Sequence, residues 1–320
     1  MNQAATAARQ TPPYSIDLAE VLDGLRKDQK SISPKYFYDE AGSQLFNQIC
    51  ELPEYYPTRV ELGIMRDNRR DMASLIGPQA SLIEFGSGSS LKTRVLLYSM
   101  LQPAAYVPVD ISTDFLFEAA RKIRDDFPEL EVLPIAADFT KTFQLPTPTV
   151  MPLRNIVYFP GSTIGNFTNN AALDLLRVMH DIAGQDGALL IGVDLQKDVS
   201  ILESAYNDAS GITAKFNLNV LQRLNKEFDA TFDLDRFKHR AIYNHDAGRI
   251  EMYLDSLEKQ TVHVGGSVFE FAEGEAMLTE HSHKYTRDGF AVMAETAGFR
   301  IEKVWLDTDH LFSVQFCIRD

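Results

Sequence analysis

The residues best suited to chemistry gather around one stretch, Glu84-Phe85-Gly86-Ser87-Gly88, which ends a short apolar run. An acid at a strand end, then glycines, then a helix is typical of the way open α/β sheets hold an adenosine-bearing cofactor. The glycines let the backbone approach a ligand where a Cβ atom would collide. A second acid, Asp110, ends the next apolar run, about where a carboxylate meets ribose hydroxyls. An ordinary strand-turn-helix corner is the alternative interpretation.

The short glycine motif also discriminates between two cofactors. Dinucleotides carry a pyrophosphate and favour G-x-G-x-x-G, whose third glycine packs the helix against the strand. Leu91 occupies that third position here, and the chain contains no phosphate-binding lysine loop of the Walker kind. S-adenosylmethionine has no phosphate and tolerates the shorter motif. The pattern therefore favours S-adenosylmethionine over a nicotinamide dinucleotide.

Polar residues follow two further apolar runs of the same kind. Asp138-Phe139 could hold the edge and the face of an adenine, although a solvated loop acid is an equal alternative. The stretch 159–167, with two glycines and Asn166, stands where a methyltransferase of this architecture usually presents the acceptor nucleophile. It lacks the Asp/Asn-Pro-Pro-Tyr/Phe sequence that grips a planar amine. This absence weighs against a nucleobase as the acceptor.

Tyrosines and one alternating polar run indicate what the acceptor could be. The run Glu280-His281-Ser282-His283-Lys284 alternates as in a strand, so its polar face lies either in a pocket or at an exposed edge. It lacks a third ligand at metal-binding spacing, and we expect no metal. Four tyrosines are either core filler at a domain contact or ring faces that stabilise an amine as it gains charge. They are Tyr36, Tyr38, Tyr55 and Tyr56.

Composition limits the classes of protein that fit. The 320 residues suffice for one large or two moderate domains, and the net charge of −14 argues against a nucleic-acid or anionic-membrane surface. Cys50 and Cys317 lack metal-ligand spacing, and we expect buried free thiols in a reducing cytoplasm. No apolar run reaches the roughly 18 residues that span a bilayer, and the N-terminus lacks a signal-peptide pattern. A soluble cytoplasmic protein is therefore expected.

Apolar runs that alternate with helical patterns predict a parallel sheet with crossover helices. The clearest helix is 112–127, with Ser112 as its N-cap. A tight turn between the last two strands predicts an antiparallel pair. This α/β pattern, a parallel sheet with a terminal antiparallel strand, fits a Rossmann-like methyltransferase better than a dehydrogenase. The predicted strands are 81–86, 105–110, 131–136, 154–160, 187–193, 300–306 and 311–318.

The chain is expected to divide into two domains. Residues 61–195 and 286–320 form the predicted cofactor-binding domain with the sheet. Residues 196–285 are too long for one crossover and rich in helical and mixed segments, so we interpret them as an insertion. Together with residues 1–60 they form a predicted smaller substrate-binding lobe.

The N-terminal part carries its own local signals. Residues 1–15 are expected to be a flexible lead-in. Pro53 and Pro57 argue against a continuous helix around the pair Tyr55-Tyr56. Helical spacing predicts helices at 16–26, 43–49, 61–75 and, beyond the motifs, 91–101 and 286–297.

Six stretches in this order resemble one family, the S-adenosylmethionine-dependent histidine Nα-methyltransferases of ergothioneine biosynthesis. The resemblance covers nearly the whole chain after about residue 30, and six blocks in order are far more specific than any one of them. His281, His283 and Tyr36 depart from the residues that are common at their positions. The six blocks are Lys35-Tyr36-Phe37-Tyr38-Asp39, Leu52-Pro53-Glu54-Tyr55-Tyr56-Pro57-Thr58-Arg59, Glu84-Phe85-Gly86-Ser87-Gly88, Gly161-Ser162-Thr163-Ile164-Gly165-Asn166, Arg249-Ile250-Glu251-Met252 and Ala276-Met277-Leu278-Thr279-Glu280.

The resemblance implies a role for each matching residue. Glu280 and Ser282 would grip an imidazole ring, with Met252 lining the same pocket. The residues implied for the methyl donor are Gly86, Lys92, Asp110, Asp138 and Phe139. Those implied for the amine and carboxylate end of the amino acid are Tyr38, Tyr55, Asn166 and Tyr206, of which Tyr38 and Asn166 are the expected catalytic residues.

The implied activity is the transfer of three methyl groups to the α-amine of L-histidine, which gives hercynine. A carboxylate paired with a hydroxyl suits this substrate, because together they can bond both ring nitrogens of an imidazole. The alternatives are the same chemistry on another amino acid or an indole-type amine, a nicotinamide-dependent oxidoreductase and a catalytically silent binding protein. We expect a monomer with a small-molecule substrate and no nucleic-acid or membrane partner.

Overall fold

The computed structural model describes residues 17–87, 91–141 and 143–319. The flexible lead-in expected at 1–15 lies outside the described residues, and so does Gly88, the second glycine of the motif. The helix expected from residue 16 is α1 (Leu18–Leu25), whose first turn is capped by the Asp17 carboxylate.

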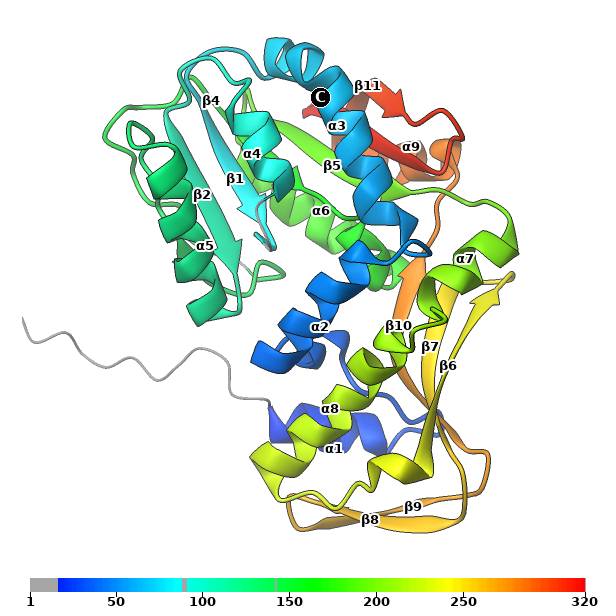
Figure 1. The fold of residues 1–320 in the computed structure, drawn as a ribbon. Coiled ribbons are helices and arrows are strands. Elements are labelled where there is room, and N and C mark those ends of the chain that lie inside the picture. Colours follow the sequence, from blue (N-terminus) through cyan, green and yellow to red (C-terminus); the bar gives the residue numbers. More distant parts are fainter. Residues whose placement is uncertain (1–16, 88–90, 142, 320) are drawn as a thin grey trace, which may run out of the picture.

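A seven-stranded sheet lies at the centre of the larger part of the molecule (Figure 1). Its strands are β1 (Ala80–Phe85), β2 (Ala105–Asp110), β3 (Ile135–Ala136), β4 (Arg154–Phe159), β5 (Ala188–Asp194), β11 (Phe299–Leu306) and β12 (Phe312–Arg319). The order is β11-β12-β5-β4-β1-β2-β3, and β12 alone runs in the direction opposite to the other strands. This is the strand order of class I methyltransferases, so the predicted fold class and the terminal antiparallel pair are confirmed.

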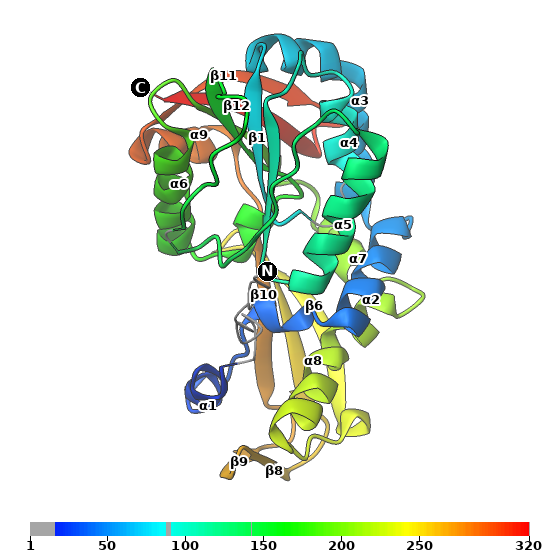
Figure 2. The same ribbon diagram turned by 90° about the vertical axis from the view of Figure 1, so that its left-hand side faces the viewer.

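Helices cover both faces of the sheet, which explains why β1 and β5 are buried along their whole length (Figure 2). One hydrophobic cluster joins the sheet to α6 (Asn169–Ala183) and α9 (Arg287–Thr296). A second cluster joins the opposite face to α3 (Tyr56–Ile76), α4 (Leu91–Leu97) and α5 (Thr113–Asp126). The loops after the parallel strands are left open at the carboxyl edge of the sheet.

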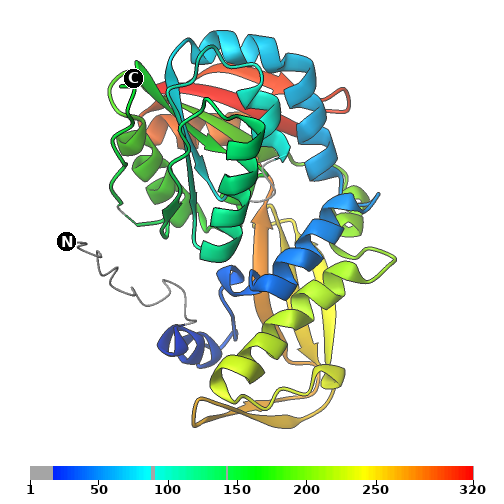
Figure 3. The same cartoon turned by 60° about the vertical axis from the view of Figure 1, so that its left-hand side comes forward.

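The remaining elements form a smaller lobe that faces this edge (Figure 3). A single hydrophobic cluster unites its N-terminal residues with those beyond residue 200. Its sheet has the antiparallel order β10-β7-β6, and β8 pairs with β9. The lobe contains α1, η1 (Pro34–Phe37), α2 (Glu40–Glu51), α7 (Val199–Tyr206), α8 (Ile212–Phe228), η3 (Leu234–Arg236), β6 (Phe237–Asn244), β7 (Arg249–Ser256), β8 (Gln260–Val264), β9 (Ser267–Phe271) and β10 (Ala276–His283).

Three details differ from the sequence-based expectations. Helix α3 begins at Tyr56 with Pro57 in its first turn, where proline is tolerated because that N–H has no helical partner. The strand expected at 131–136 shrinks to β3, and Val132 makes only an isolated bridge to Tyr106. Ser112 stands at the N-cap of α5, but its side chain makes no capping hydrogen bond.

Two expectations about residue environment are also answered. Cys317 is a buried free thiol as predicted, whereas Cys50 is only half-buried. None of the helices within the described residues is long and apolar enough to cross a membrane.

Candidate active site

A cavity of about 480 Å³ lies between the carboxyl edge of the parallel sheet and the lobe. This volume is in the range of small-molecule sites, which are usually 300–1,000 Å³. Among the predicted site residues, only Met252 is absent from its lining. The cavity therefore brings together Gly86, Lys92, Asp110, Asp138, Phe139, Asn166, Tyr38, Tyr55, Tyr206, Glu280 and Ser282.

The sheet side of the cavity forms a cradle in which Gly86 is central. Gly86 follows β1 with φ of +73°, and a Cβ atom there would stand 3.8 Å from the Phe139 ring. The Phe139 ring stacks on Phe85 with centroids 5.4 Å apart, so its position is fixed by the core. Backbone approach and an aromatic face beside a strand end fit an adenosine-bearing group.

Two carboxylates complete this cradle at the ends of β2 and β3. The Asp110 Oδ1 atom accepts a hydrogen bond from the Ser112 N–H at 2.9 Å. The Asp138 Oδ1 atom accepts from the Thr140 N–H at 3.0 Å and from the Thr140 hydroxyl at 2.5 Å. Local bonds thus fix both side chains, and each carboxylate has further acceptor capacity for hydroxyl or amino groups.

Lys92 is held by a carboxylate that the sequence analysis did not single out. Its ammonium pairs with Glu61 of α3, a side chain that is fully buried. The two Glu61 oxygens also accept from the Gly161 N–H at 3.0 and 2.9 Å. Gly192 of β5 leaves the room for this carboxylate, because a Cβ atom there would stand 2.2 Å from Glu61 Oε1. Glu61 therefore connects the lysine to the loop after β4.

Glu84 at the end of β1 is bound within the protein. Its oxygens accept from the hydroxyl of Thr93 at 2.8 and 2.7 Å and from the hydroxyl of Tyr106. Burial raises the pKa of Glu84 to about 7, against the opposing effect of these hydrogen bonds. The acid of the glycine motif thus ties α4 to β1 and β2.

The lobe side of the cavity is dominated by β10. Strand alternation turns Glu280, Ser282 and Lys284 toward the cavity, whereas neither His281 nor His283 belongs to its lining. Met252 pairs with Glu280 across β7 and β10 and is buried in the core of the lobe. The predicted imidazole pair therefore lies on one face, and the flanking histidines lie on the other.

Several groups that face the cavity have no hydrogen-bond partner among the described residues. Glu280 is 8% exposed, and no donor among the described residues reaches its carboxylate. Burial raises the pKa of Glu280 to about 7, although Lys284 acts to lower it. The hydroxyls of Tyr38 and Tyr55 and the amide of Asn166 also make no hydrogen bond to described residues. Burial, followed by nearby charges and phenols, raises the pKa of both tyrosines well above 10.

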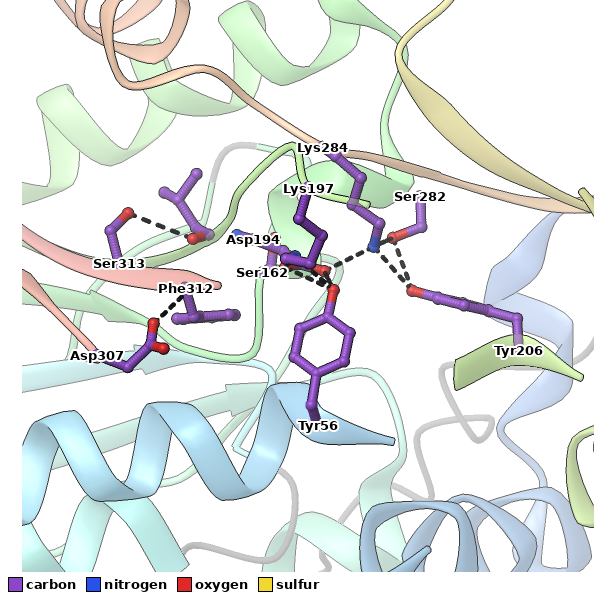
Figure 4. Close-up of polar contacts among 11 residues, drawn as sticks. Tyr56, Ser162, Asp194, Lys197, Tyr206, Ser282, Lys284, Asp307, Phe312 and Ser313 are labelled. Carbon is purple, nitrogen blue, oxygen red and sulfur yellow. Dashed lines mark hydrogen bonds and ion pairs between the residues drawn. The ribbon is translucent and has the colours of Figure 1, made fainter. Parts of the chain in front are cut away.

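A buried ionic network lies behind these groups (Figure 4). The Lys284 Nζ donates to Asp194 Oδ2 at 2.8 Å, to the Tyr206 hydroxyl at 3.0 Å and to Ser282 Oγ at 2.9 Å. Tyr56 donates to Asp194 at 2.8 Å, and Lys197 pairs with the same carboxylate. Although burial raises the pKa of Asp194, the two ammonium groups lower it below its ordinary value.

Close backbone packing fixes Asn166 relative to Glu280. Asn166 ends the short helix η2 (Thr163–Asn166), which contacts β10. At Gly165 a Cβ atom would stand 2.7 Å from the His283 carbonyl oxygen, so only glycine fits. The His283 Nδ1 atom lies 3.0 Å from the Gly165 carbonyl oxygen, which adds a hydrogen bond at the same contact.

Three residues that hold the site together from behind, Lys284, Asp194 and Glu61, were not among the predicted site residues. Lys284 continues the alternation of Glu280 and Ser282, a signal that could have found it. Asp194 ends an apolar strand as Asp110 does, and it could have been found in the same way. Glu61 lies inside a helix and carried no local signal. Within the described residues no group of three or more His, Cys, Asp or Glu side chains could hold a metal ion.

Comparisons with known proteins agree with this geometry. Residues 17–319 match the family model described as histidine-specific methyltransferase, SAM-dependent. The chain is 40% identical over 305 residues to the histidine N-alpha-methyltransferase of Mycolicibacterium smegmatis, with 94% of each chain covered. It is 38% identical over 295 residues to the protein of that name from Mycobacterium tuberculosis, with 90% of each covered.

A more distant relative has a longer chain. The protein is 28% identical over 275 residues to ergothioneine biosynthesis protein 1 of Schizosaccharomyces pombe, an alignment that covers 82% of this chain and 36% of the relative. The family model and the two bacterial relatives, by contrast, cover nearly the whole chain. The chain therefore belongs to the S-adenosylmethionine-dependent, histidine-specific methyltransferases.

Proposed function

We propose that the protein transfers three methyl groups from S-adenosylmethionine to the α-amine of L-histidine, giving hercynine as the first step of ergothioneine synthesis. Family membership and the names of the relatives support the substrate and the reaction. The observation that carries the proposal is the buried Glu280 carboxylate next to Ser282 on the cavity face of β10, to which no described residue donates a hydrogen bond. Such a group selects a ligand that supplies the missing donor.

The sheet side of the cavity would hold the methyl donor. S-adenosylmethionine supplies an activated methyl group when bound. The backbone at Gly86 and the ring of Phe139 would receive its adenine and ribose, with Asp110 and Asp138 accepting from hydroxyl or amino groups. Lys92 would offer a cation to a carboxylate, with Glu61 holding it in place.

The lobe and the loop after β4 would together position the amine that is methylated. Tyr38, Tyr55, Tyr206 and Asn166 line the cavity and would hold the amine and carboxylate end of histidine. Displacement at the methyl carbon needs a neutral amine lone pair in the correct direction, so the work of the protein is mainly orientation. We assign this orientation to Tyr38 and Asn166. Tyrosine faces would also stabilise the positive charge that the nitrogen gains.

The imidazole end gives the preference for histidine. Glu280 can accept from one ring nitrogen and Ser282 can bond the other. An indole offers one donor and no acceptor, so a tryptophan-like substrate would leave the Ser282 hydroxyl unpaired. Met252, which is buried against the same strand, would support this pocket from behind. We further propose that residues 1–60 and 196–285 act as the substrate-binding domain, with 61–195 and 286–320 binding the cofactor.

The test is mass spectrometry of L-histidine after incubation with the protein and S-adenosylmethionine. A gain of three methyl groups on the α-nitrogen is expected. Binding of S-adenosylhomocysteine without any histidine product would reject histidine and direct the assay to other amino acids. We also propose that the protein is cytoplasmic and monomeric. Light scattering on the purified protein would check the monomer through its mass of 36.0 kDa.

A further inference from the structure

Lys284 is a deeply buried cation to which the proposed chemistry assigns no task. Its side chain is 1% exposed, and its ammonium group has three hydrogens. Three acceptors surround it, namely Asp194, the Tyr206 hydroxyl and Ser282 Oγ, at 2.8, 3.0 and 2.9 Å. Burial alone disfavours the ammonium, but the charge of Asp194 and these contacts raise the pKa of Lys284 above its ordinary value. Lys284 is therefore a permanent donor with every hydrogen in use.

The position of Lys284 determines what the Ser282 hydroxyl can do. Ser282 Oγ accepts from Lys284 Nζ at 2.9 Å and from the Tyr206 hydroxyl at 2.9 Å. A hydroxyl has two lone pairs and one hydrogen, so both acceptor positions of Ser282 are occupied. Its own hydrogen is the only group left for a ligand in the cavity. Ser282 thus faces the cavity as a donor.

Glu280, two residues away on the same face of β10, faces the cavity as a hydrogen-bond acceptor. Its carboxylate has no donor among the described residues, and an ionised carboxylate can only accept. The pair therefore presents one acceptor and one donor to a ring that reaches both. A neutral imidazole matches this arrangement because one nitrogen carries a hydrogen and the other a lone pair. An imidazolium has two N–H groups and would place one against the Ser282 hydrogen.

We propose that Lys284 is a specificity-determining residue that, by filling the lone pairs of Ser282 together with Tyr206, restricts the site to the neutral imidazole of histidine. The neutral ring donates its N–H to Glu280 and accepts from Ser282. The inference rests on the proposed function and names the protonation state that the site selects. Lys284 acts through Ser282, so it is a positioning residue.

The other ionisable groups around Glu280 and Ser282 do not change this arrangement of one acceptor and one donor. On the cavity side Tyr38, Tyr55 and Tyr206 all have a pKa raised by burial, so they stay neutral. Behind Lys284 stand Asp194 and Lys197, which pair with each other. The groups on the reverse face of β10 and on β7 are His281 and His283, whose pKa values are lowered by burial, and the ion pair of Arg249 with Glu251.

The experiment compares L-histidine with L-1,2,4-triazolylalanine, whose ring keeps an N–H and a bare nitrogen but stays neutral in mild acid. Calorimetry would give both dissociation constants at pH 8 and pH 5.5 with S-adenosylhomocysteine present. Protonation of Glu280 weakens the binding of both ligands alike. The dissociation constant of histidine divided by that of triazolylalanine therefore reports the protonation of the histidine ring alone. In the wild-type protein the ratio should rise about tenfold at pH 5.5, because free imidazole has a pKa of about 6.5.

Two variants distinguish the effect of the Ser282 donor role from the effect of the Lys284 charge. Lys284→Met leaves Ser282 able to accept, so imidazolium should bind and the ratio should rise less than about threefold. Tyr206→Phe keeps the ammonium but frees one Ser282 lone pair, and it should give an intermediate rise. Retained affinity for S-adenosylhomocysteine shows that each variant is folded.

The outcomes are distinct. Equal ratios in the wild-type protein and folded Lys284→Met overturn the inference. If Lys284→Met does not fold, a wild-type ratio in Tyr206→Phe overturns it, and an intermediate ratio supports it. A wild-type protein that binds S-adenosylhomocysteine but neither methylates nor binds histidine overturns the proposed function instead.

Discussion

The two sides of the cavity differ in how far the protein satisfies its own polar groups. On the sheet side, Asp110, Asp138 and Lys92 each have a partner within the protein. On the lobe side, the Glu280 carboxylate and the Tyr38 hydroxyl have no hydrogen-bond partner among the described residues. Unpaired groups that are already removed from water gain most from a ligand that fits them and lose most from one that does not. The lobe side should therefore discriminate strictly, whereas the sheet side should bind firmly and tolerate change.

Glu280→Ala should cause the largest loss and confirm this contrast. Removing the buried acceptor should weaken histidine binding by about 2–4 kcal/mol, because a charge-assisted contact is lost. Calorimetry should show an unchanged affinity for S-adenosylhomocysteine. Glu270→Ala, at an exposed position of β9 in the same lobe, is the matched control. Unchanged histidine affinity in Glu280→Ala would remove Glu280 from the site.

Glu280→Gln should show how much the buried Glu280 carboxylate lowers the free energy of unfolding, and at which pH. Its pKa is raised from 4.5 to about 7, so between these values the folded protein holds a proton that the unfolded chain has lost. Stability contributed by this group therefore falls as pH rises through that window, by roughly 3 kcal/mol in full. The variant should melt at a higher temperature than the wild type above pH 7, and the difference should vanish near pH 4.5. A constant difference across pH would contradict the assignment.

Asn166→Ala tests orientation at the end of η2, where the loop after β4 packs against β10 of the lobe. Loss of the amide should lower kcat by about 100-fold, the effect of a small misplacement of reacting groups. Affinity for S-adenosylhomocysteine should stay close to that of the wild type. Asn169→Ala, at an exposed position three residues later, should behave as the wild type. Equal losses of turnover and cofactor affinity in Asn166→Ala would indicate a folding role.

Gly86→Ala tests the sheet side and should have the smallest effect. The added Cβ would stand inside the cradle, 3.8 Å from the Phe139 ring, so affinity for S-adenosylhomocysteine should fall by about tenfold. The φ of +73° adds about 1–2 kcal/mol of backbone strain. Gly77→Ala places the same strain at φ of +78°, with no atom within 4 Å of the added Cβ. That control should lower the melting temperature without changing cofactor affinity. If Gly86→Ala lost more affinity for histidine than for S-adenosylhomocysteine, the contrast between the two sides would be reversed.

The sheet side was predictable because its signals are local. Gly86 and Asp110 stand at the ends of buried apolar strands, and parallel strands bring such residues to one edge. The boundary of α3 was misplaced because Pro57 was interpreted as a helix breaker, although the first turn accepts proline. The strand at 131–136 is short because only Ile135 and Ala136 pair with β2.

The lobe side was less predictable because its contacts are long-range. Of the five strands from β6 to β10, only the end of β10 was expected as a strand, from the alternating run 280–284. The other four lie in a region that was expected to form helical and mixed segments. Exposed positions such as Lys238 interrupt the apolar pattern of β6. The bond between Tyr206 and Ser282 spans 76 residues, so no local pattern could indicate that the two hydroxyls meet. The residue types were found through the family resemblance, whereas the contacts by which Lys284 and Asp194 connect them are visible only in the fold.

The contact at Gly165 has a consequence for the length of the substrate. Because the backbones of η2 and β10 already touch there, the span from Asn166 to Glu280 cannot shorten, and any side chain at position 165 would lengthen it. An amino acid must bridge that span to place its nitrogen at one end and its ring at the other. The site thus selects its substrate by length as well as by hydrogen-bonding groups. A histidine homologue with one more methylene should reach Glu280 only by drawing its amine away from the methyl group.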